Sequence, residues 1–447
     1  MNKVLKYGAL AVFVGVGAGA VAHADEATTT GGFKIKSSDG NFDASLGGRV
    51  HFDALLNLPD KNSEKIGSGA AGASDLNSDF EFRRVFISLA GHVYKDFEYH
   101  IDYDIASSNF QDVWIAYADP IGGTVYGGQH KPWRSLDEIA SNNNTVFLER
   151  SITSATGIYG GIDYTQGVYY AINKHVFLAD DNIWGGASVY SLHKQGGGQQ
   201  VRTQGTGYNA RLAYAPFVTK TSWAHVGISY SNENADGAGS AVVGGGLTST
   251  SGVFTGFAPA YTYGGRSGAK LTLATYATAA TGNPHADSLA AELAGAWGPI
   301  YLQGEFVDVG YHQNGVVDNS VDAYSVTGAY TITGETRPYD KKSATYGGIK
   351  PTNSYGAVEV AVRYDHGRND KHGGSYHGLS EAGITAGANA SGDPVTADSV
   401  SMITAGINYY VNSSVRFVLD YTHGEAKLGS AGKDSPDAFG LRAQLVF

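Results

Sequence analysis

Arginine residues recur on the polar face of several alternating segments of this chain. Arg49 lies in the segment 42–56, and Arg83 and Arg84 lie near the start of the segment 80–104. A guanidinium group stays charged at any physiological pH and binds oxyanions through two parallel hydrogen bonds. These three residues could therefore line a path for anions. Arginines on other polar faces, which could extend it, are Arg211, Arg363, Arg416 and Arg442.

The same polar faces carry carboxylates, which gives the arginines an alternative chemistry. These carboxylates are Asp43, Asp53, Asp102, Asp104, Glu305, Glu359, Asp365 and Asp420. Opposite charges on neighbouring strands form ion pairs, and a paired arginine attracts an anion less strongly. Asp102 and Asp104 could also form an acid/base or cation-binding pair. We favour a position on an inner wall opposite arginines, and the alternation leaves open which arginines are paired.

A second group of charges falls where the alternation stops, between residues 131 and 150. Its cations are Lys131, Arg134 and Arg150, and its carboxylates are Asp137, Glu138 and Glu149. Ser135 and Glu138 have the spacing of a capping box, which predicts a short helix over Leu136 to Ala140. A helix in a chain of strands indicates a special loop. If this loop lies inside a pore, its charges form opposing patches across a constriction.

Strands must position both groups, because apolar and polar residues alternate with period two. The segment 42–56 places Phe42, Ala44 and Leu46 on one face and Asp43 and Ser45 on the other, and the segments 354–365 and 439–447 repeat the pattern. The first two runs exceed ten residues and the third reaches the last residue after nine, all longer than the roughly five or six of an average soluble strand. Transmembrane barrel strands need about 9–11 residues, with apolar side chains toward lipid. The pattern predicts an all-β, transmembrane antiparallel barrel.

The connections predict how many strands the barrel has. Short turns are expected at 95–96, 119–123, 179–181, 216–220, 298–299 and 412–413, and long loops at 57–79, 132–157, 193–207, 234–286, 311–320, 366–399 and 425–436. Outer-membrane barrels alternate short periplasmic turns with long outer loops. Counting strands between these connections gives about sixteen. The segment from Gly334 to Asn353 is long but falls on the side of the short turns, so it breaks the rule.

Composition narrows the class of protein further. The 447 residues include 62 Gly, 29 Tyr and no Cys, and the formal net charge is −11. Without cysteine there is no disulfide scaffold, thiolate metal site or cysteine nucleophile, and we find no nucleophile elbow, zinc protease or nucleotide-binding motif. We therefore expect no catalytic residue, metal, cofactor or nucleic-acid partner. The five tryptophans, spread along the chain, suit anchoring at the membrane interface.

The N-terminus predicts export. Lys3 and Lys6 precede an apolar run from Ala9 to Val21, and small residues follow at Ala22 and Ala24. This order is typical of a cleaved secretory signal peptide. We predict a signal peptide over 1–24, a short N-terminal segment over 25–32 and one barrel domain over 33–447.

Five stretches carry a resemblance to a known family. They are Phe80 to Asp104, Gly127 to Ser151, Ala329 to Asp340, and the C-terminal stretches GINYYVNSSVRF and FGLRAQLVF. In this order they resemble the phosphate-selective porin O and P family of Gram-negative outer membranes, over most of the chain beyond the predicted signal peptide and least across 174–300.

The resemblance implies a sixteen-stranded porin in the cell outer membrane, usually a homotrimer surrounded by lipid. It implies that the third loop folds into the lumen and that wall arginines attract oxyanions such as phosphate, so that small hydrophilic solutes diffuse through with a preference for anions. Arg49, Arg83 and Arg84 match the family's arginines best. We expect Lys131, Arg134 and Arg150 to complete the anion path, and Asp137, Glu138, Asn142, Asn143, Asn144 and Glu149 to belong to the constriction loop.

One departure keeps an alternative open. Phosphate-specific members carry a lysine in this loop, where the present chain has the tract Asn142-Asn143-Asn144. A weakly selective or cation-preferring porin is therefore the first alternative. A barrel enzyme or an adhesin that acts through its outer loops is the alternative from another class, and the missing nucleophile motif argues against the enzyme.

Overall fold

The computed structural model defines where the strands lie. It describes residues 24–28, 33–58, 78–154, 159, 163–192, 205–234, 256–257, 260–262, 270–272, 276–277, 285–312, 319–370, 399–427 and 433–447. The predicted signal peptide lies outside the described residues except for Ala24, which begins the strand β1 (Ala24–Thr28). The boundary of that peptide stays a prediction.

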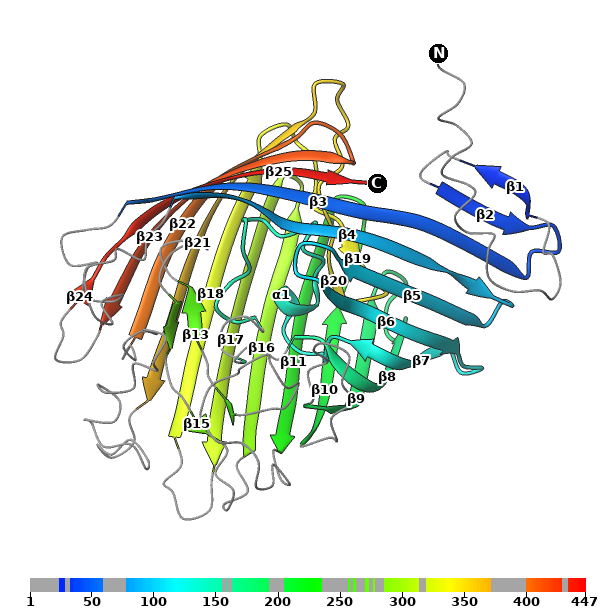
Figure 1. The fold of residues 1–447 in the computed structure, drawn as a ribbon, viewed down its shortest axis with the longest axis horizontal. Coiled ribbons are helices and arrows are strands. Elements are labelled where there is room, and N and C mark those ends of the chain that lie inside the picture. The colour runs from blue at the N-terminus through cyan, green and yellow to red at the C-terminus, as the bar shows by residue number, and fades with distance from the viewer. Residues whose placement is uncertain are drawn as a thin grey trace.

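Sixteen strands form one closed antiparallel barrel, so the predicted fold class and strand number are confirmed. Their bounds are β3 (Phe42–Leu58), β4 (Asp79–Val93), β5 (Phe97–Asp104), β6 (Asn109–Ala118), β7 (Gly123–His130), β8 (Thr165–Lys174), β9 (Asn182–Ser191), β10 (Thr206–Ala215), β11 (Ser222–Asn234), β16 (His285–Trp297), β17 (Ile300–His312), β18 (Asn319–Thr331), β21 (Ala357–Asp370), β22 (Ser399–Tyr410), β23 (Val415–Lys427) and β25 (Asp437–Val446). Each strand pairs with the next, and β25 pairs back with β3, which leaves the barrel without an open edge (Figure 1).

The strands are apolar outside and polar inside, the reverse of a soluble core. On β17, Leu302 and Phe306 are exposed on the outer surface, whereas Gln303 and Glu305 are buried toward the interior. Lipid is the solvent outside, so apolar side chains there cost nothing, while inward polar groups find partners or water. The alternation of apolar and polar residues in the sequence therefore corresponds to the lipid-facing and lumen-facing sides of the barrel wall.

Helix is nearly absent from the described residues. The α-helix α1 (Leu136–Ile139) begins at the N-cap Ser135, whose hydroxyl accepts a hydrogen bond from the Glu138 backbone N–H at 3.3 Å. The predicted helix is thereby confirmed, ending one residue earlier than expected. In the part of the chain that the structure describes, no helix has the length and apolar character needed to cross a membrane.

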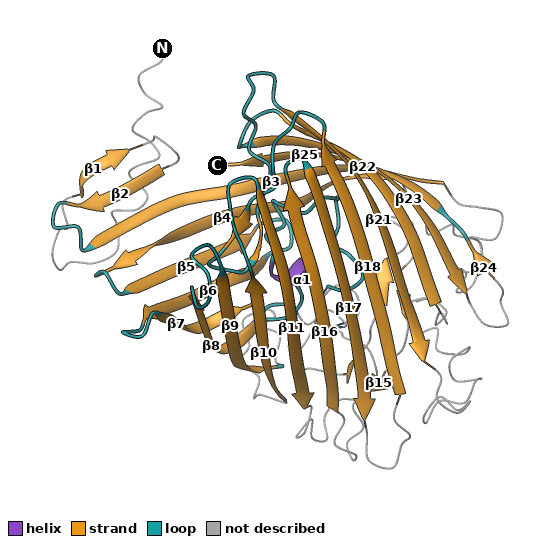
Figure 2. Cartoon of the chain, turned by 180° about the vertical axis from the view of Figure 1, so that it is seen from behind, coloured by secondary structure: helices purple, strands orange, loops and turns teal. Residues whose placement is uncertain are grey.

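Short and long connections lie at opposite ends of the barrel. The predicted turns join β4 to β5, β6 to β7, β16 to β17 and β22 to β23, and the long predicted loops fall at the other end. The β5–β6 connection at the long-loop end, residues 105–108, is a four-residue turn that the sequence did not mark. Figure 2 shows α1 and its neighbouring loop inside the barrel.

The exception among the turns, residues 332–356 between β18 and β21, folds back into the barrel. We call it the inner-turn segment. It carries the short strands β19 (Tyr339–Asp340) and β20 (Thr345–Tyr346), which pair with each other. Ala344 and Tyr346 are fully or almost fully buried. The segment is longer than the other turns at this end of the barrel because it fills part of the lumen.

The C-terminus closes the barrel on a glycine. The backbone N–H of Gly48 donates to the carbonyl oxygen of Phe447 at 2.9 Å, and a Cβ at Gly48 would lie 2.4 Å from the Phe86 carbonyl oxygen and 2.7 Å from Cζ of the Phe447 ring. A side chain at Gly48 would therefore displace the last residue. The residues of β3 that precede Gly48 do not pair with β25. They pair with β2 (Phe33–Ser37), which extends the barrel wall beside the start of β3.

Candidate permeation site in the barrel lumen

The constriction loop, defined as residues 131–154, crosses the lumen and is bound by carboxylates of distant strands. Arg134 Nη1 lies 2.8 Å from Glu233 Oε1 on β11. The backbone N–H groups of Asp137 and Leu148 donate to Glu305 on β17 and Asp420 on β23, at 2.8 and 2.7 Å. These contacts confirm that the third loop lies inside the barrel. Several inward carboxylates thus hold the loop and do not line an open pore.

Wall arginines bind the loop from its other side. Arg363 donates to the carbonyl oxygen of Glu149 at 2.9 Å, Arg416 to that of Val146 at 3.0 Å and Arg442 to that of Leu148 at 2.7 Å. Arg363 and Arg442 also form ion pairs, with Asp365 and Asp53 respectively. The sequence left open whether these distal arginines pair with carboxylates of the wall. Arg363 and Arg442 do so. Arg416 forms no ion pair within the described residues.

Three predicted cations of the anion path are paired with carboxylates. Arg49 Nη2 lies 3.2 Å from Asp102 Oδ2. Lys131 Nζ lies 3.1 Å from Asp163 Oδ1 and 3.6 Å from Glu138 Oε1. Arg134, as described above, pairs with Glu233. Their charges are therefore largely balanced locally, and their place on an anion path stays a prediction.

Arg83 and Arg84 share one carboxylate unequally. Arg83 donates from Nε and Nη2 to the two oxygens of Glu149, at 2.6 and 3.1 Å. Arg84 Nη2 is 3.9 Å from Glu149, and its buried Nη1 has no hydrogen-bond partner among the residues that the structure describes. Only 7% of Arg84 is exposed. A buried guanidinium without a full set of partners has capacity left for an anion.

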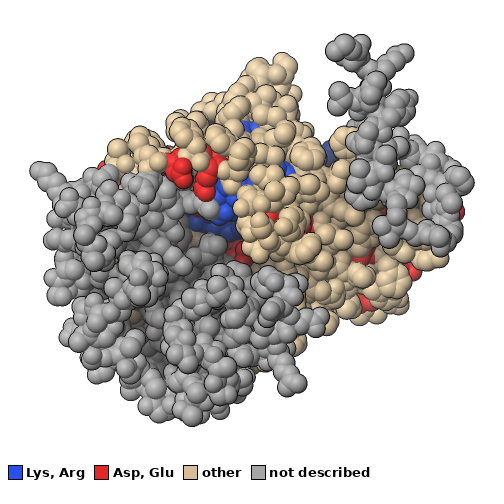
Figure 3. Space-filling view, viewed as in Figure 1, with Lys and Arg blue, Asp and Glu red and all other residues tan. Residues whose placement is uncertain are grey.

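The residues opposite Arg84 on the neighbouring strands of the wall are polar and carry no carboxylate. His51 lies directly opposite Arg84 on β3, and Gln444 lies opposite His51 on β25. His51 is fully buried, and its Nε2 lies 3.2 Å from the Asn143 side-chain oxygen. Figure 3 shows basic atoms deep in a hollow of one face, with acidic atoms beside them. This row therefore adds no carboxylate next to Arg84.

The asparagine tract is bound to the wall. Gln444 Nε2 donates to the Asn143 carbonyl oxygen at 3.1 Å, and Arg416 Nη1 donates to the same oxygen at 3.4 Å. The Asn142 side chain accepts from Arg150, which also donates to the carbonyl oxygen of Asp137 at 2.6 Å. The tract therefore supplies neutral oxygens to Gln444 and Arg416 of the wall and to Arg150 of the loop, at the position where the resemblance would place a lysine.

The inner-turn segment completes the lumen, and the sequence signalled it only by its length. Trp184 Nε1 and Trp223 Nε1 donate to the carbonyl oxygens of Lys342 and Arg337, at 2.8 and 2.7 Å. Arg211 donates to the Ala344 carbonyl at 2.8 Å. The prediction that the tryptophans anchor at the membrane interface was wrong for these two. They face inward because the segment offers carbonyl groups to their N–H donors.

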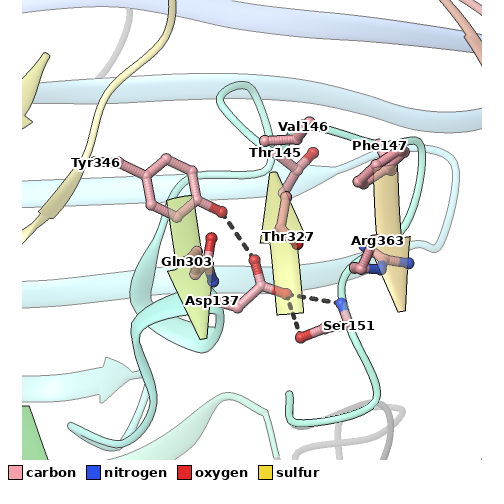
Figure 4. A pocket seen from close by; sticks show the side chains of 9 residues that line it. All are labelled: Asp137, Thr145, Val146, Phe147, Ser151, Gln303, Thr327, Tyr346 and Arg363. Atoms are coloured by element: carbon pink, nitrogen blue, oxygen red, sulfur yellow. Dashed lines mark hydrogen bonds between the residues drawn. The ribbon is translucent and has the colours of Figure 1, made fainter. Parts of the chain in front are cut away.

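Two side chains of the inner-turn segment reach the constriction loop. Arg337 Nη1 donates to the Asn144 carbonyl oxygen at 2.9 Å, and the Tyr346 hydroxyl donates to Asp137 Oδ1 at 2.8 Å. Asp137 Oδ2 accepts in turn from the backbone N–H and hydroxyl of Ser151 (Figure 4). Arg337 and Tyr346 are site residues that the sequence analysis did not single out, although Arg337 lies in a segment that carried the resemblance.

Comparison with known proteins now identifies the class. The model of the phosphate-selective porin O and P family matches residues 65–447. This chain belongs to that family. It is 26% identical over 446 residues to Porin O of Pseudomonas aeruginosa, a match that covers 94% of this chain and 92% of that protein. The predicted family is confirmed, and the protein is an anion-preferring porin of the cell outer membrane, a channel rather than an enzyme.

Solved structures share the fold of this porin at low sequence identity. The anion-selective porin of Comamonas acidovorans is 11% identical with a TM-score of 0.51, and the match covers 91% of this chain and 100% of that one. OmpT of Vibrio cholerae is 10% identical with a TM-score of 0.50, and the match covers 91% of this chain and 98% of that one. At this identity the likeness shows the fold alone.

Two carboxylates of this porin, Glu149 in the constriction loop and Asp163 beyond it, are held in their charged form. Burial raises the pKa of Glu149, but Arg83 and Arg84 outweigh it and hold that pKa well below the usual carboxyl value. Burial also opposes ionisation of Asp163, whereas Lys131 and Arg150 lower its pKa to about 2. Both carboxylates therefore stay ionised at physiological pH.

Proposed function

We propose that oxyanions such as phosphate pass between the constriction loop and the β3–β4 wall, with Arg84 as the main contact. The observation that carries this proposal is the unpartnered, buried Nη1 of Arg84. Arg49, Arg83, Lys131, Arg134 and Arg150, also predicted for the path, are secondary contacts in this proposal, because the first four form ion pairs with carboxylates and Arg150 binds oxygens of the loop. A guanidinium that already binds two carboxylate oxygens has little capacity left for a passing ion.

The charge around Glu149 supports a preference for anions. Its oxygens lie 2.6 Å from Arg83, 3.9 Å from Arg84 and 3.5 Å from Arg442. Asp53 pairs with Arg442, and Glu81 also acts on Arg83. The support therefore comes from Arg84, which has the longest carboxylate contact of the three arginines. The negative net charge of the chain does not oppose this, because an ion in a narrow low-dielectric site responds to the nearest charges.

The asparagine tract supports attraction of anions in general over tight binding of phosphate alone. Asn143 contributes neutral oxygens next to His51 and Gln444, and a lysine there would add a charge-assisted donor. We expect phosphate to pass and to compete with chloride, with modest affinity.

Ion selectivity tests the proposal directly. The zero-current potential of the channel in a KCl gradient should show anion preference, and Arg84→Gln should reduce it. Arg368→Gln is the matched control, because it removes the same charge from a side chain that is 59% exposed and pairs with Asp322. An equal shift in both variants would mean that total charge, and not Arg84, sets the preference.

Phosphate competition separates the alternatives. Millimolar phosphate should lower the chloride conductance of the wild type and lower it less in Arg84→Gln. A cation-selective wild type would favour the cation-preferring alternative. Absence of any conductance from folded protein would favour an adhesin that acts through its outer loops.

We also propose that this porin is a homotrimer embedded in outer-membrane lipid. The outer face of β3 and β4 supports this, because Phe52, Phe80 and Phe82 are exposed there and their rings contact one another. Large rigid rings are typical anchors of protein interfaces. Native mass spectrometry in detergent should give three copies for the wild type and fewer for Phe82→Arg. A monomeric wild type would contradict the proposal.

A further inference from the structure

We infer that the inner-turn segment is a clamp that sets the position of the constriction-loop tip, with Arg337 as its positioning residue. The tip is the asparagine tract 142–144. The clamp thereby fixes the width left for ions, and its effect on selectivity rests on the proposed anion path. Its effect on pore width does not depend on which ions pass.

Arg337 connects a rigid wall to the tip. Its Nη2 lies 2.7 and 2.8 Å from the two oxygens of Glu359 on β21, and both side chains are about 1% exposed. Its Nη1 donates to the carbonyl oxygens of Asn144 and Gly347, at 2.9 and 3.1 Å. The planar guanidinium holds these partners at fixed angles. A displacement of Asn144 must therefore break a buried charge-assisted hydrogen bond.

Packing around Arg337 keeps it in this position. Its guanidinium lies 5.1 and 5.6 Å from the ring centroids of Tyr301 and Tyr346, and its backbone carbonyl accepts from Trp223. Buried apolar residues from the loop, Leu136 and Phe147 among them, belong to the same cluster as these rings. The loop, the walls and the inner-turn segment thus form one packed unit.

Tyr346 adds a second link, to the start of the constriction loop at Asp137. Its hydroxyl donates to Asp137, which also accepts from Ser151. One carboxylate therefore joins the start of the loop, its return and the inner-turn segment (Figure 4). The wall alone holds the tip with longer bonds, 3.1 Å from Gln444 and 3.4 Å from Arg416 to the Asn143 carbonyl.

A matched pair of variants tests the clamp with little risk to folding. Tyr346→Phe removes the hydroxyl that bonds the loop, whereas Tyr339→Phe removes a hydroxyl of the same segment that lies 2.8 Å from His225 on the wall. Loss of one hydrogen bond should raise the population of a displaced tip about fivefold. Single-channel recordings should show higher conductance and more open-channel noise for Tyr346→Phe, and wild-type values for Tyr339→Phe.

A disulfide between the tip and the inner-turn segment tests whether holding the tip restores the wild-type channel. If Tyr346 served only the stability of the fold, this disulfide would not reverse the effect of Tyr346→Phe. A Cβ at Gly348 would lie 2.8 Å from the Asn144 side-chain oxygen, and the chain has no other cysteine. In the pair Asn144→Cys with Gly348→Cys, mild oxidation should tie the tip to the clamp. When the cysteine pair is combined with Tyr346→Phe and oxidised, its conductance and open-channel noise should be as low as those of the oxidised cysteine pair alone. After reduction, the same variant should show the higher conductance and noise of Tyr346→Phe.

The outcomes separate the clamp from the proposed anion path. Wild-type conductance and noise in Tyr346→Phe, equal effects of both tyrosine variants, or failure of the disulfide to form in the folded porin would each overturn the clamp. A cation-selective wild type with an intact response to Tyr346→Phe would overturn the anion path and leave the clamp standing.

Discussion

Two groups of wall arginines share a residue type and a strand pattern but differ in what they contact. Arg363, Arg416 and Arg442, on β21, β23 and β25, donate to carbonyl oxygens of the constriction loop. On β4, Arg83 binds Glu149 through both oxygens, whereas Arg84 keeps a donor without a partner. The first group holds the loop, and Arg416 within it also keeps its buried Nε without a hydrogen-bond partner among the described residues. Arg84 differs from it because, within the same residues, it donates no hydrogen bond to a loop carbonyl and can therefore meet an ion with its whole Nη1 edge.

The difference shows that an inward arginine is not by itself an anion contact. What decides is the number of acceptors that the fold places around it. Arg442 has both oxygens of Asp53 at 2.7 Å and a loop carbonyl, which uses most of its donors. Arg84 has one carboxylate oxygen at 3.9 Å. Stability should therefore depend on the first residue and selectivity on the second.

The largest expected effect is the loss of stability in Arg442→Met. This change leaves Asp53 buried without its partner, and breaking such a pair costs about 3–5 kcal/mol. Urea unfolding of the barrel in detergent, followed by gel mobility, should show a clear drop in the midpoint. Arg84→Met is the control and should change the midpoint much less. Equal losses in both variants would remove the distinction between the two groups.

The next effect is on selectivity, in Arg84→Glu. The charge changes by two units at a site where an ion a few ångström away senses on the order of 1 kcal/mol from each unit, so the anion-to-cation permeability ratio should fall at least about thirtyfold. Zero-current potentials in a salt gradient measure this ratio. Arg368→Glu, on the outer surface, should leave it nearly unchanged. A larger shift from Arg368→Glu would contradict a local origin of selectivity.

A third change sharpens the comparison by adding a donor near Arg84. Asn143→Lys places an ammonium group beside His51, and a charge-assisted hydrogen bond contributes about 1.5–3 kcal/mol. Phosphate should therefore block chloride conductance at roughly tenfold lower concentration. Asn143→Gln, which keeps a neutral amide, is the control. An unchanged block by phosphate would show that the tip does not face the path of the ions.

The smallest expected effect is acid sensitivity through Asp163, which pairs with Lys131 and with neither arginine group. Its pKa is lowered from the ordinary value of 3.8 to about 2. A lowered carboxyl pKa adds stability that is present above pH 3.8 and is lost as the pH falls through about 2. Unfolding midpoints of the wild type and Asp163→Asn should converge over that range. A constant difference down to pH 2 would contradict the lowered pKa.

Much of the barrel could be predicted because its pattern is local. Period-two alternation follows from strand geometry and from lipid on one side, and both act on residues close in sequence. The helix α1 was predictable for the same reason, since Ser135 caps the N–H of Glu138 three residues away. The position of the third loop came from the family resemblance, and contacts with Glu305 and Asp420 confirm it.

The sequence could not predict which arginines hold the constriction loop and which is left to contact an ion. Arg442 meets Asp53 because β25 closes on β3, which joins residues 389 positions apart. Alternation places both residues on an inward face but gives no register across the seam. The inner-turn segment shows the same limit. Its length marked it as unusual, yet only the folded lumen brings Trp184 and Trp223 to its carbonyl groups.

The sequence by itself determined that this chain forms a long-stranded barrel with an interrupted third loop and arginines toward the interior, because side-chain direction along a strand is fixed by the backbone. The tertiary structure decided which charges are neutralised. Strand register and the path of two inward segments set the distance from each guanidinium to its nearest acceptors, and hydrogen bonds act over only about 3 Å. Arg84 became the candidate contact for anions because the fold places its nearest carboxylate oxygen 3.9 Å away, whereas Arg83 and Arg442 each bind two carboxylate oxygens directly.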